Sequence, residues 1–99
     1  MIVKTLAVAA MILTGGTAVA QACDATVRGL SGRYDLATGS GFLAIRAQPT
    51  ARSRMVGQTF NGNALDVIRT RGRWWFVYDY GSGKRGWVYS KYARWGCGD

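Results

Sequence analysis

Several residue types that usually carry enzyme chemistry are missing from this 99-residue chain. It contains no histidine and no glutamate, and its five acidic residues are all aspartates. Catalysis usually needs a base beside a nucleophile, or a positioned pair of carboxyl groups as in glycosidases. Nothing in the sequence fixes two of the scattered aspartates as such a pair. We therefore expect a protein that is not an enzyme.

Cysteine is also scarce, with only Cys23 and Cys97 in the whole chain. Two cysteines without histidine cannot complete a tetrahedral zinc site within one chain. A glycine-rich tetrapeptide at residues 81–84 could suggest a phosphate loop, but no helical segment follows it. We therefore expect neither a metal nor a cofactor.

The N-terminal segment has the features of a secretory signal peptide. Lys4 gives it a basic start, an uncharged apolar stretch follows, and small residues precede two possible cleavage points, after Ala20 and after Ala22. The apolar stretch is too short to span a bilayer, and no later segment is long enough. We expect residues 1–22 to be removed and residues 23–99 to form one domain, periplasmic or secreted, without a transmembrane segment.

The two cysteines lie at opposite ends of this expected mature domain. In an oxidising compartment we expect a disulfide between Cys23 and Cys97. A domain this small is near the size at which one hydrophobic core is only marginally stable. A bond that closes so long a loop contributes roughly 4 kcal/mol in the chain-entropy model. The alternative is lipidation of Cys23, although Ala20 stands where bacterial lipoproteins usually have leucine and Cys97 would then have no partner.

The charge of the chain is strongly basic. Thirteen lysines and arginines face five aspartates, which gives a net charge of +8. Lys4 belongs to the expected signal peptide, so the mature domain carries a net charge of +7. An exported domain of this charge should meet anionic partners such as cell-wall polymers, lipid headgroups or nucleic acid.

Short extended segments separated by turn residues run through the rest of the chain. Alternation of apolar and polar residues predicts strands at 42–46 and 64–69, and weaker strands at 25–28 and 55–59. Two aromatic segments, 74–80 and 86–89, are joined by Gly81-Ser82-Gly83-Lys84, which predicts a β-hairpin. Five or six short strands at this spacing are typical of a small all-β barrel or sandwich.

The order of these segments resembles that of the bacterial SH3-like domains. Five short motifs follow in order: Leu43–Pro49 (LAIRAQP), Val56-Gly57, Asn61–Val67 (NGNALDV), Trp74–Val77 (WWFV) and Gly86–Tyr92 (GWVYSKY). The resemblance is strongest over residues 42–92, and it departs from the family at Ala93, where leucine or isoleucine is usual. It implies a partly open barrel of five to six antiparallel strands and a non-catalytic binding role, in several members for peptidoglycan.

The aromatic strand of the hairpin supplies the first group of candidate ligand-binding residues. If Val77 points into the core, as the resemblance implies, Trp75 and Asp79 share its face. The opposite face then carries Trp74, Phe76, Tyr78 and Tyr80. We expect at least two of these four rings to be exposed, because so small a domain cannot bury both faces of a hairpin. Exposed rings stack on the apolar faces of sugars; the alternative is that they pack under neighbouring loops.

Basic residues beside the aromatic strand supply the second group. Arg69, Arg71 and Arg73 precede it, and the following turn carries Lys84 and Arg85. Guanidinium groups pair with carboxylates and phosphates, so we assign ligand binding to Arg73, Lys84 and Arg85; a solvated turn is the alternative.

Arg46, at the end of a predicted strand, has a different expected role. It matches the strand-end arginine of the bacterial SH3-like domains, and this resemblance implies a structural residue that bonds carbonyl groups of the following loop.

Together these features favour an exported module that binds cell-envelope components such as peptidoglycan through an aromatic and arginine surface. The alternative is a protein-interaction module or inhibitor that binds an extended peptide of an envelope protein. Nucleic acid is less favoured as a partner, because a domain outside the cytoplasm would seldom meet it, although basic charge with interleaved aromatics also suits single strands.

Overall fold

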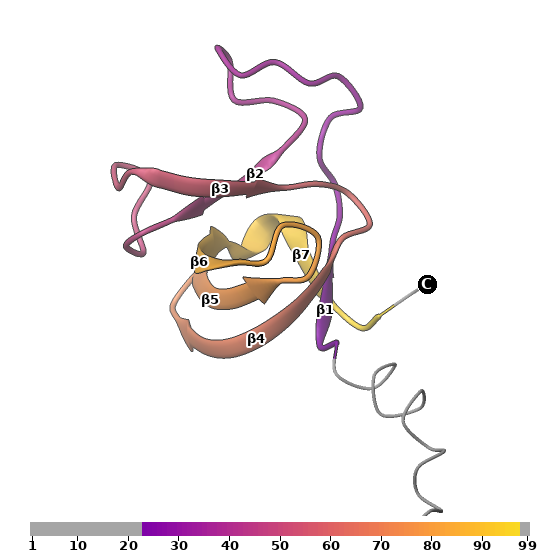
Figure 1. The fold of residues 1–99 in the computed structure, drawn as a ribbon, viewed down its shortest axis with the longest axis vertical. Coiled ribbons are helices and arrows are strands. Elements are labelled where there is room, and N and C mark those ends of the chain that lie inside the picture. Colours follow the sequence, from indigo (N-terminus) through magenta and orange to yellow (C-terminus); the bar gives the residue numbers. More distant parts are fainter. Residues whose placement is uncertain (1–22, 98–99) are drawn as a thin grey trace, which may run out of the picture.

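The computed structural model describes residues 23–97. Over these residues the chain forms seven short strands (Figure 1). The expected signal peptide at residues 1–22 and its cleavage points lie outside the described residues, as does Asp99. A 3-10 helix, η2 (Ser90–Tyr92), precedes the last strand. The strands are β1 (Ala25–Val27), β2 (Leu43–Arg46), β3 (Met55–Thr59), β4 (Ala64–Arg71), β5 (Trp74–Asp79), β6 (Lys84–Tyr89) and β7 (Ala93–Trp95).

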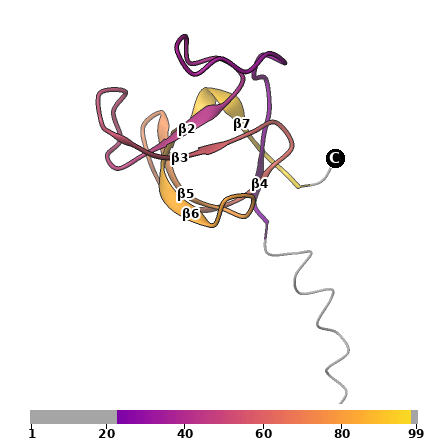
Figure 2. The same cartoon turned by 45° about the horizontal axis from the view of Figure 1, so that its top comes forward.

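The strands form one curled antiparallel sheet in the order β3-β2-β6-β5-β4-β1-β7. Figure 2 shows how β2 and β3 lie across from β5 and β6, with β1 and β7 on one side. The sheet is open, because β3 and β7 are its two edges and no pairing joins them. The all-β, partly open antiparallel arrangement implied by the family resemblance is thus confirmed.

The structure has one strand more than the sequence predicts, and two of its strands are clearly longer than predicted. β7 was not predicted, because three residues after a helical turn carry no alternation of their own; it forms by pairing with β1, with Thr26 opposite Arg94. β4 runs on to Arg71, so the turn between β4 and β5 is shorter than expected. Lys84 and Arg85, expected in a turn, are the first residues of β6.

Six of the strands send apolar side chains into one core. Val77 of β5 is fully buried, Asp79 on the same face is also buried, and Trp75 packs against the edge of the core. The predicted inner face of this strand is therefore confirmed. The core residues are Ala25, Val27, Leu43, Ile45, Leu65, Val77, Val88 and Ala93.

Strands β2 and β6, which are neighbours in the sheet, approach each other closely at Gly86. A Cβ atom at this position would lie 2.6 Å from Cγ2 of Ile45 and 2.7 Å from the carbonyl oxygen of Arg46. Real Cβ atoms essentially never approach neighbouring atoms so closely. Only glycine lets the two strands come together at this point.

The two ends of the described chain are tied together. Cys23 and Cys97 form the expected disulfide, with their Cα atoms 5.9 Å apart. The bond uses the sulfur atom of Cys23 that lipidation would require. Asp24 adds to the junction: its backbone N–H donates to the carbonyl of Leu65, and its carboxylate accepts a bond from the N–H of Val67 at 2.9 Å.

Between β1 and β2 the chain leaves the barrel as a long arm, at the top of Figure 1. Within the arm, Asp35 and Ser40 form an isolated β-bridge. The arm contacts the barrel through Tyr34, whose ring centroid lies 6.2 Å from that of Phe60. Across residues 23–97, no helix is both long and apolar enough to cross a membrane.

Candidate functional site

The outer surface of strands β4, β5 and β6 carries the predicted aromatic residues in cross-strand rows. In one row Phe76 lies between Arg69 of β4 and Trp87 of β6. In the next, Tyr78 lies between Asp66 and Arg85. We call this surface the aromatic face and define it by Trp74, Phe76, Tyr78 and Tyr80 together with Trp87 and Tyr89 of β6.

Neighbouring rings on the aromatic face pack pairwise. The ring centroids of Trp74 and Tyr89 are 5.5 Å apart, and those of Phe76 and Trp87 are 5.3 Å apart. Tyr78 and Tyr80 meet edge to face at 5.0 Å. These separations lie in the favourable range for aromatic pairs, so the rings hold one another in place before any ligand arrives.

This packing corrects the expectation that at least two of the four β5-side rings are exposed. Tyr80 is exposed, at 45% of its surface, whereas Trp74, Phe76 and Tyr78 are half-buried. Each of these three rings loses part of its surface to a ring of the adjoining strand or turn, a pairing that single-strand alternation does not show.

Arginine side chains lie over several of these rings. The guanidinium carbon of Arg69 is 4.7 Å from the ring centroid of Phe76 and 5.5 Å from that of Trp87. The guanidinium carbon of Arg85 lies 5.7 Å from the centroid of Tyr78. Such stacking is favourable and limits the freedom of the arginine side chain.

The structure divides the three predicted basic site residues between the two ends of the hairpin. Arg73 lies in the turn between β4 and β5, where its carbonyl accepts a bond from the N–H of Ser90. Lys84 and Arg85 lie at the other end of β5. The stem of Lys84 passes close to Gly57 of β3, with its Cγ 3.0 Å from the position of an added Cβ. Of these three residues, Arg85 reaches the aromatic face by lying over the ring of Tyr78.

Three residues of this surface, Arg69, Trp87 and Tyr89, are not among the candidate residues that the sequence indicates. Arg69 was noticed but not chosen, because its facing depends on an irregularity in β4. Trp87 and Tyr89 were recognised only as parts of a family motif; Trp87 is 6% exposed and stands in the same row as Arg69 and Phe76. The sequence signal that could have identified them is the second aromatic segment of the predicted hairpin, because hairpin pairing sets Trp87 opposite Phe76 and Tyr89 opposite Trp74.

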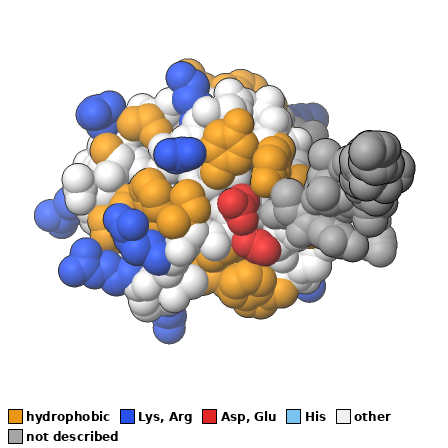
Figure 3. Space-filling model, turned by 60° about the horizontal axis from the view of Figure 1, so that its bottom comes forward, with side chains coloured by type: hydrophobic (Ala, Val, Ile, Leu, Met, Phe, Trp, Pro, Cys, Tyr) orange, Lys and Arg blue, Asp and Glu red, His pale blue; other side chains and the backbone are white. Residues whose placement is uncertain are grey.

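Two aspartates that the sequence did not pair lie together beside the aromatic face. A hydrogen bond with Asp24 raises the pKa of the Asp66 carboxyl, and desolvation and the Asp24 charge raise it further. The pKa of the Tyr80 hydroxyl is also raised, first by desolvation and then by the charges of Asp66 and Asp24. Figure 3 shows this side of the molecule, where basic and hydrophobic side chains are interspersed around one acidic patch.

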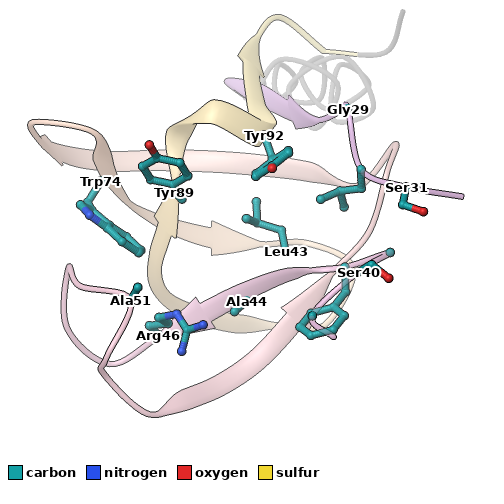
Figure 4. A pocket seen from close by; sticks show the side chains of 14 residues that line it. Gly29, Ser31, Ser40, Leu43, Ala44, Arg46, Ala51, Trp74, Tyr89 and Tyr92 are labelled. Carbon is teal, nitrogen blue, oxygen red and sulfur yellow. The ribbon is translucent and has the colours of Figure 1, made fainter. Parts of the chain in front are cut away.

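A groove of about 420 Å³ adjoins the aromatic face at Trp74. In Figure 4 the rings of Trp74, Tyr89 and Tyr92 line one side, and Ala51 and Arg46 lie across from Trp74. The arm between β1 and β2 closes the far end with Ser31 and Ser40. Arg46 is held there by a bond from Nη1 to the carbonyl of Ser53 at 2.8 Å, which confirms its expected structural role.

Metal binding has no candidate in this part of the chain. Among residues 23–97, no three histidine, cysteine, aspartate or glutamate side chains come together as metal ligands would.

A small open barrel with a ring-lined groove and an aromatic face has the form of a binding module. Residues 41–93 match the bacterial SH3 domain family. The match covers more than half of the chain, which therefore belongs to this family. Comparison with curated proteins gives no match. The family is one of binding modules, and the arm and β1 lie outside the matched residues.

Proposed function

We propose that this protein is an exported, non-catalytic module that binds the cell envelope, with peptidoglycan as its ligand and the aromatic face as its binding surface. The observation that carries the proposal is the set of cross-strand rows in which arginine side chains lie over aromatic rings on one outer surface. Such a surface offers apolar planes and fixed cations together.

Peptidoglycan presents the chemistry that complements this surface. Its sugar rings have apolar faces that stack on Trp and Tyr side chains, whose few rotatable bonds keep the cost of ordering low. Its peptides carry carboxylates, which guanidinium groups bind in a bidentate manner. The net charge of +7 expected for the mature domain draws the protein toward such an anionic polymer.

Export is the second part of the proposal. The Cys23–Cys97 disulfide is consistent with a compartment outside the cytoplasm. The basic and apolar N-terminal segment at residues 1–22 supports the same location as a signal peptide.

Co-sedimentation with purified peptidoglycan sacculi tests the proposed ligand. We expect the mature domain to pellet with sacculi in low salt and a Trp74→Ala/Tyr78→Ala variant to remain in the supernatant. A Tyr34→Ala/Phe60→Ala variant is the matched control, because it removes two rings that lie away from the aromatic face. Failure of the unaltered domain to bind sacculi at low salt contradicts the proposal.

The groove favours a second candidate, the binding of an extended peptide from an envelope protein. A volume of about 420 Å³ lined by four rings, those of Phe42, Trp74, Tyr89 and Tyr92, suits a few residues of an extended chain. Trp74 belongs to both surfaces, so other positions must separate them. Ala51→Trp narrows the groove from an exposed position, and Tyr78→Ala alters only the aromatic face. Loss of binding with Ala51→Trp alone points to the groove.

A further inference from the structure

The irregularity in β4 decides which side chains this strand contributes to the aromatic face. Val67 pairs with the buried Val77, and strict alternation would then place Ile68 opposite Phe76. The register shifts between Val67 and Arg69, so Arg69 stands opposite Phe76 instead. A β-bulge re-aims the side chains that follow it, and here it turns Arg69 onto the aromatic face.

The bulge leaves an apolar side chain exposed to solvent. Ile68 is left 45% exposed, although it is one of the larger apolar side chains of the domain. Bulges are over-represented at sheet edges, at barrel rims and next to active sites, where they re-aim a side chain or end the pairing. The side chain redirected toward the rings here is the guanidinium of Arg69.

We infer that Arg69 is the residue through which the aromatic face recognises a carboxylate group of its ligand. The inference rests on the proposed function and names the chemical group that the site selects. Arg69 is exposed, and its guanidinium lies over Phe76 and Trp87 at 4.7 and 5.5 Å. Stacking limits the freedom of the guanidinium, whose planar fork of N–H donors matches a carboxylate.

The stacking contacts favour Arg69 over Arg85 as the main anchor, because Arg69 lies over two rings at 4.7 and 5.5 Å and Arg85 lies over one ring at 5.7 Å. Among residues 23–97, no acidic side chain forms an ion pair with Arg69. Arg85 lies in the next row, where Tyr78 separates it from Asp66. Arg85 is the second contact: it lies two strands across and one row along from Arg69, about 12 Å away given the spacing of strands and residues in a sheet.

This spacing specifies the ligand further. A polymer whose carboxylates recur at intervals of about 12 Å can reach Arg69 and Arg85 at once, given the spacing of residues and strands in a sheet. A neutral glycan would use the rings but leave both guanidinium groups without partners. The selected ligand is thus the peptide-bearing, carboxylate-rich part of the envelope polymer.

Sacculus binding with an Arg69→Lys variant tests the inference, because lysine keeps the charge but loses the flat, two-pronged donor. We expect the affinity of this variant for sacculi to fall about tenfold, with its melting temperature unchanged. Amidation of the sacculus carboxylates should lower the affinity of the unaltered domain by a similar factor. Arg52→Lys, in an exposed loop, is the matched control and should bind normally. If the unaltered domain binds sacculi and the Arg69→Lys variant binds them equally well, the role of Arg69 is overturned. The proposed function would still stand in that case.

A second measurement does not depend on sacculi. In the ¹⁵N-labelled domain, the Nε–H signal of Arg69 should shift on titration with sodium acetate, and by more than the signal of Arg52 at equal ionic strength. Equal shifts at the two arginines overturn the inference whatever the sacculi show. A larger response to sodium phosphate than to acetate also overturns the carboxylate assignment and points to a phosphodiester polymer.

Discussion

Thr59 and Asp79 form a fully buried hydrogen bond that joins β3 to the end of β5. The hydroxyl of Thr59 donates to Oδ1 of Asp79 at 2.9 Å, and neither residue is accessible to solvent. The same carboxylate accepts bonds from the hydroxyl and the N–H of Ser82 at 2.6 and 3.0 Å and from the N–H of Gly81 at 3.3 Å. A buried charge is tolerated only with such saturation. Asp79 thus shapes the hairpin turn and anchors it to the barrel.

Replacing Asp79 with alanine should destabilise the domain by about 3 kcal/mol, because Thr59 and the turn N–H groups would lose their acceptor. Urea unfolding followed by tryptophan fluorescence measures the change. Asp35→Ala is the control: its carboxylate is exposed and bonds only the N–H of Ala37, so its effect should stay below about 1 kcal/mol. Equal effects at the two positions would contradict the anchoring role.

Gly86→Ala should destabilise the domain by about 1–3 kcal/mol, because the added methyl group overlaps Ile45 and the backbone of Arg46. Thermal unfolding by circular dichroism gives the readout. Gly32→Ala is a close comparison, since an added Cβ there meets nothing within 4 Å. An unchanged melting temperature for Gly86→Ala would show that β2 and β6 can separate without cost.

Reduction of the Cys23–Cys97 bond should lower the stability by about 2–5 kcal/mol, as for other native disulfides of small domains. The bond spans 74 positions of sequence, and it also holds β1 and β7 at the open end of the sheet. Comparing urea midpoints with and without a reductant, and for a Cys23→Ser/Cys97→Ser variant, measures this contribution. Coinciding midpoints would mean that the backbone bonds of Asp24 suffice to hold the termini.

Asp66→Asn should make the domain more stable at neutral pH. The pKa of Asp66 is raised above its ordinary value of 3.8 in the folded state, chiefly by its hydrogen bond with Asp24. The folded state therefore binds the proton more tightly than the unfolded chain, and stability falls as pH rises from 3.8 to the raised pKa. The stability of the Asp66→Asn variant should not fall over this pH range, because asparagine does not titrate. Melting temperatures measured from pH 3 to pH 7 check this, and parallel curves for the two proteins would contradict it.

Much of this protein could be predicted from residue order alone. The hairpin of β5 and β6 and the pairing of the two cysteines follow from alternation, turn residues and the position of the cysteines at the chain ends, and the inner face of Val77 was implied by the family resemblance. The bond from Arg46 to the loop carbonyl of Ser53 was also expected. These features are local, or they depend on a pair of residues that has no competing partner in the described chain.

The sequence by itself determined the fold class and which strand would carry the rings, because strand alternation and turn chemistry are local properties. Tertiary structure alone decided which arginine meets those rings, since the β4 bulge exists only when β4 pairs with β5. It also decided that Asp24 and Asp66, far apart in sequence, share a hydrogen bond beside Tyr80, and that Trp74 borders a groove closed by the arm. The physical reason is that register and barrel closure depend on contacts between segments distant in sequence, which the periodicity of any single segment does not specify.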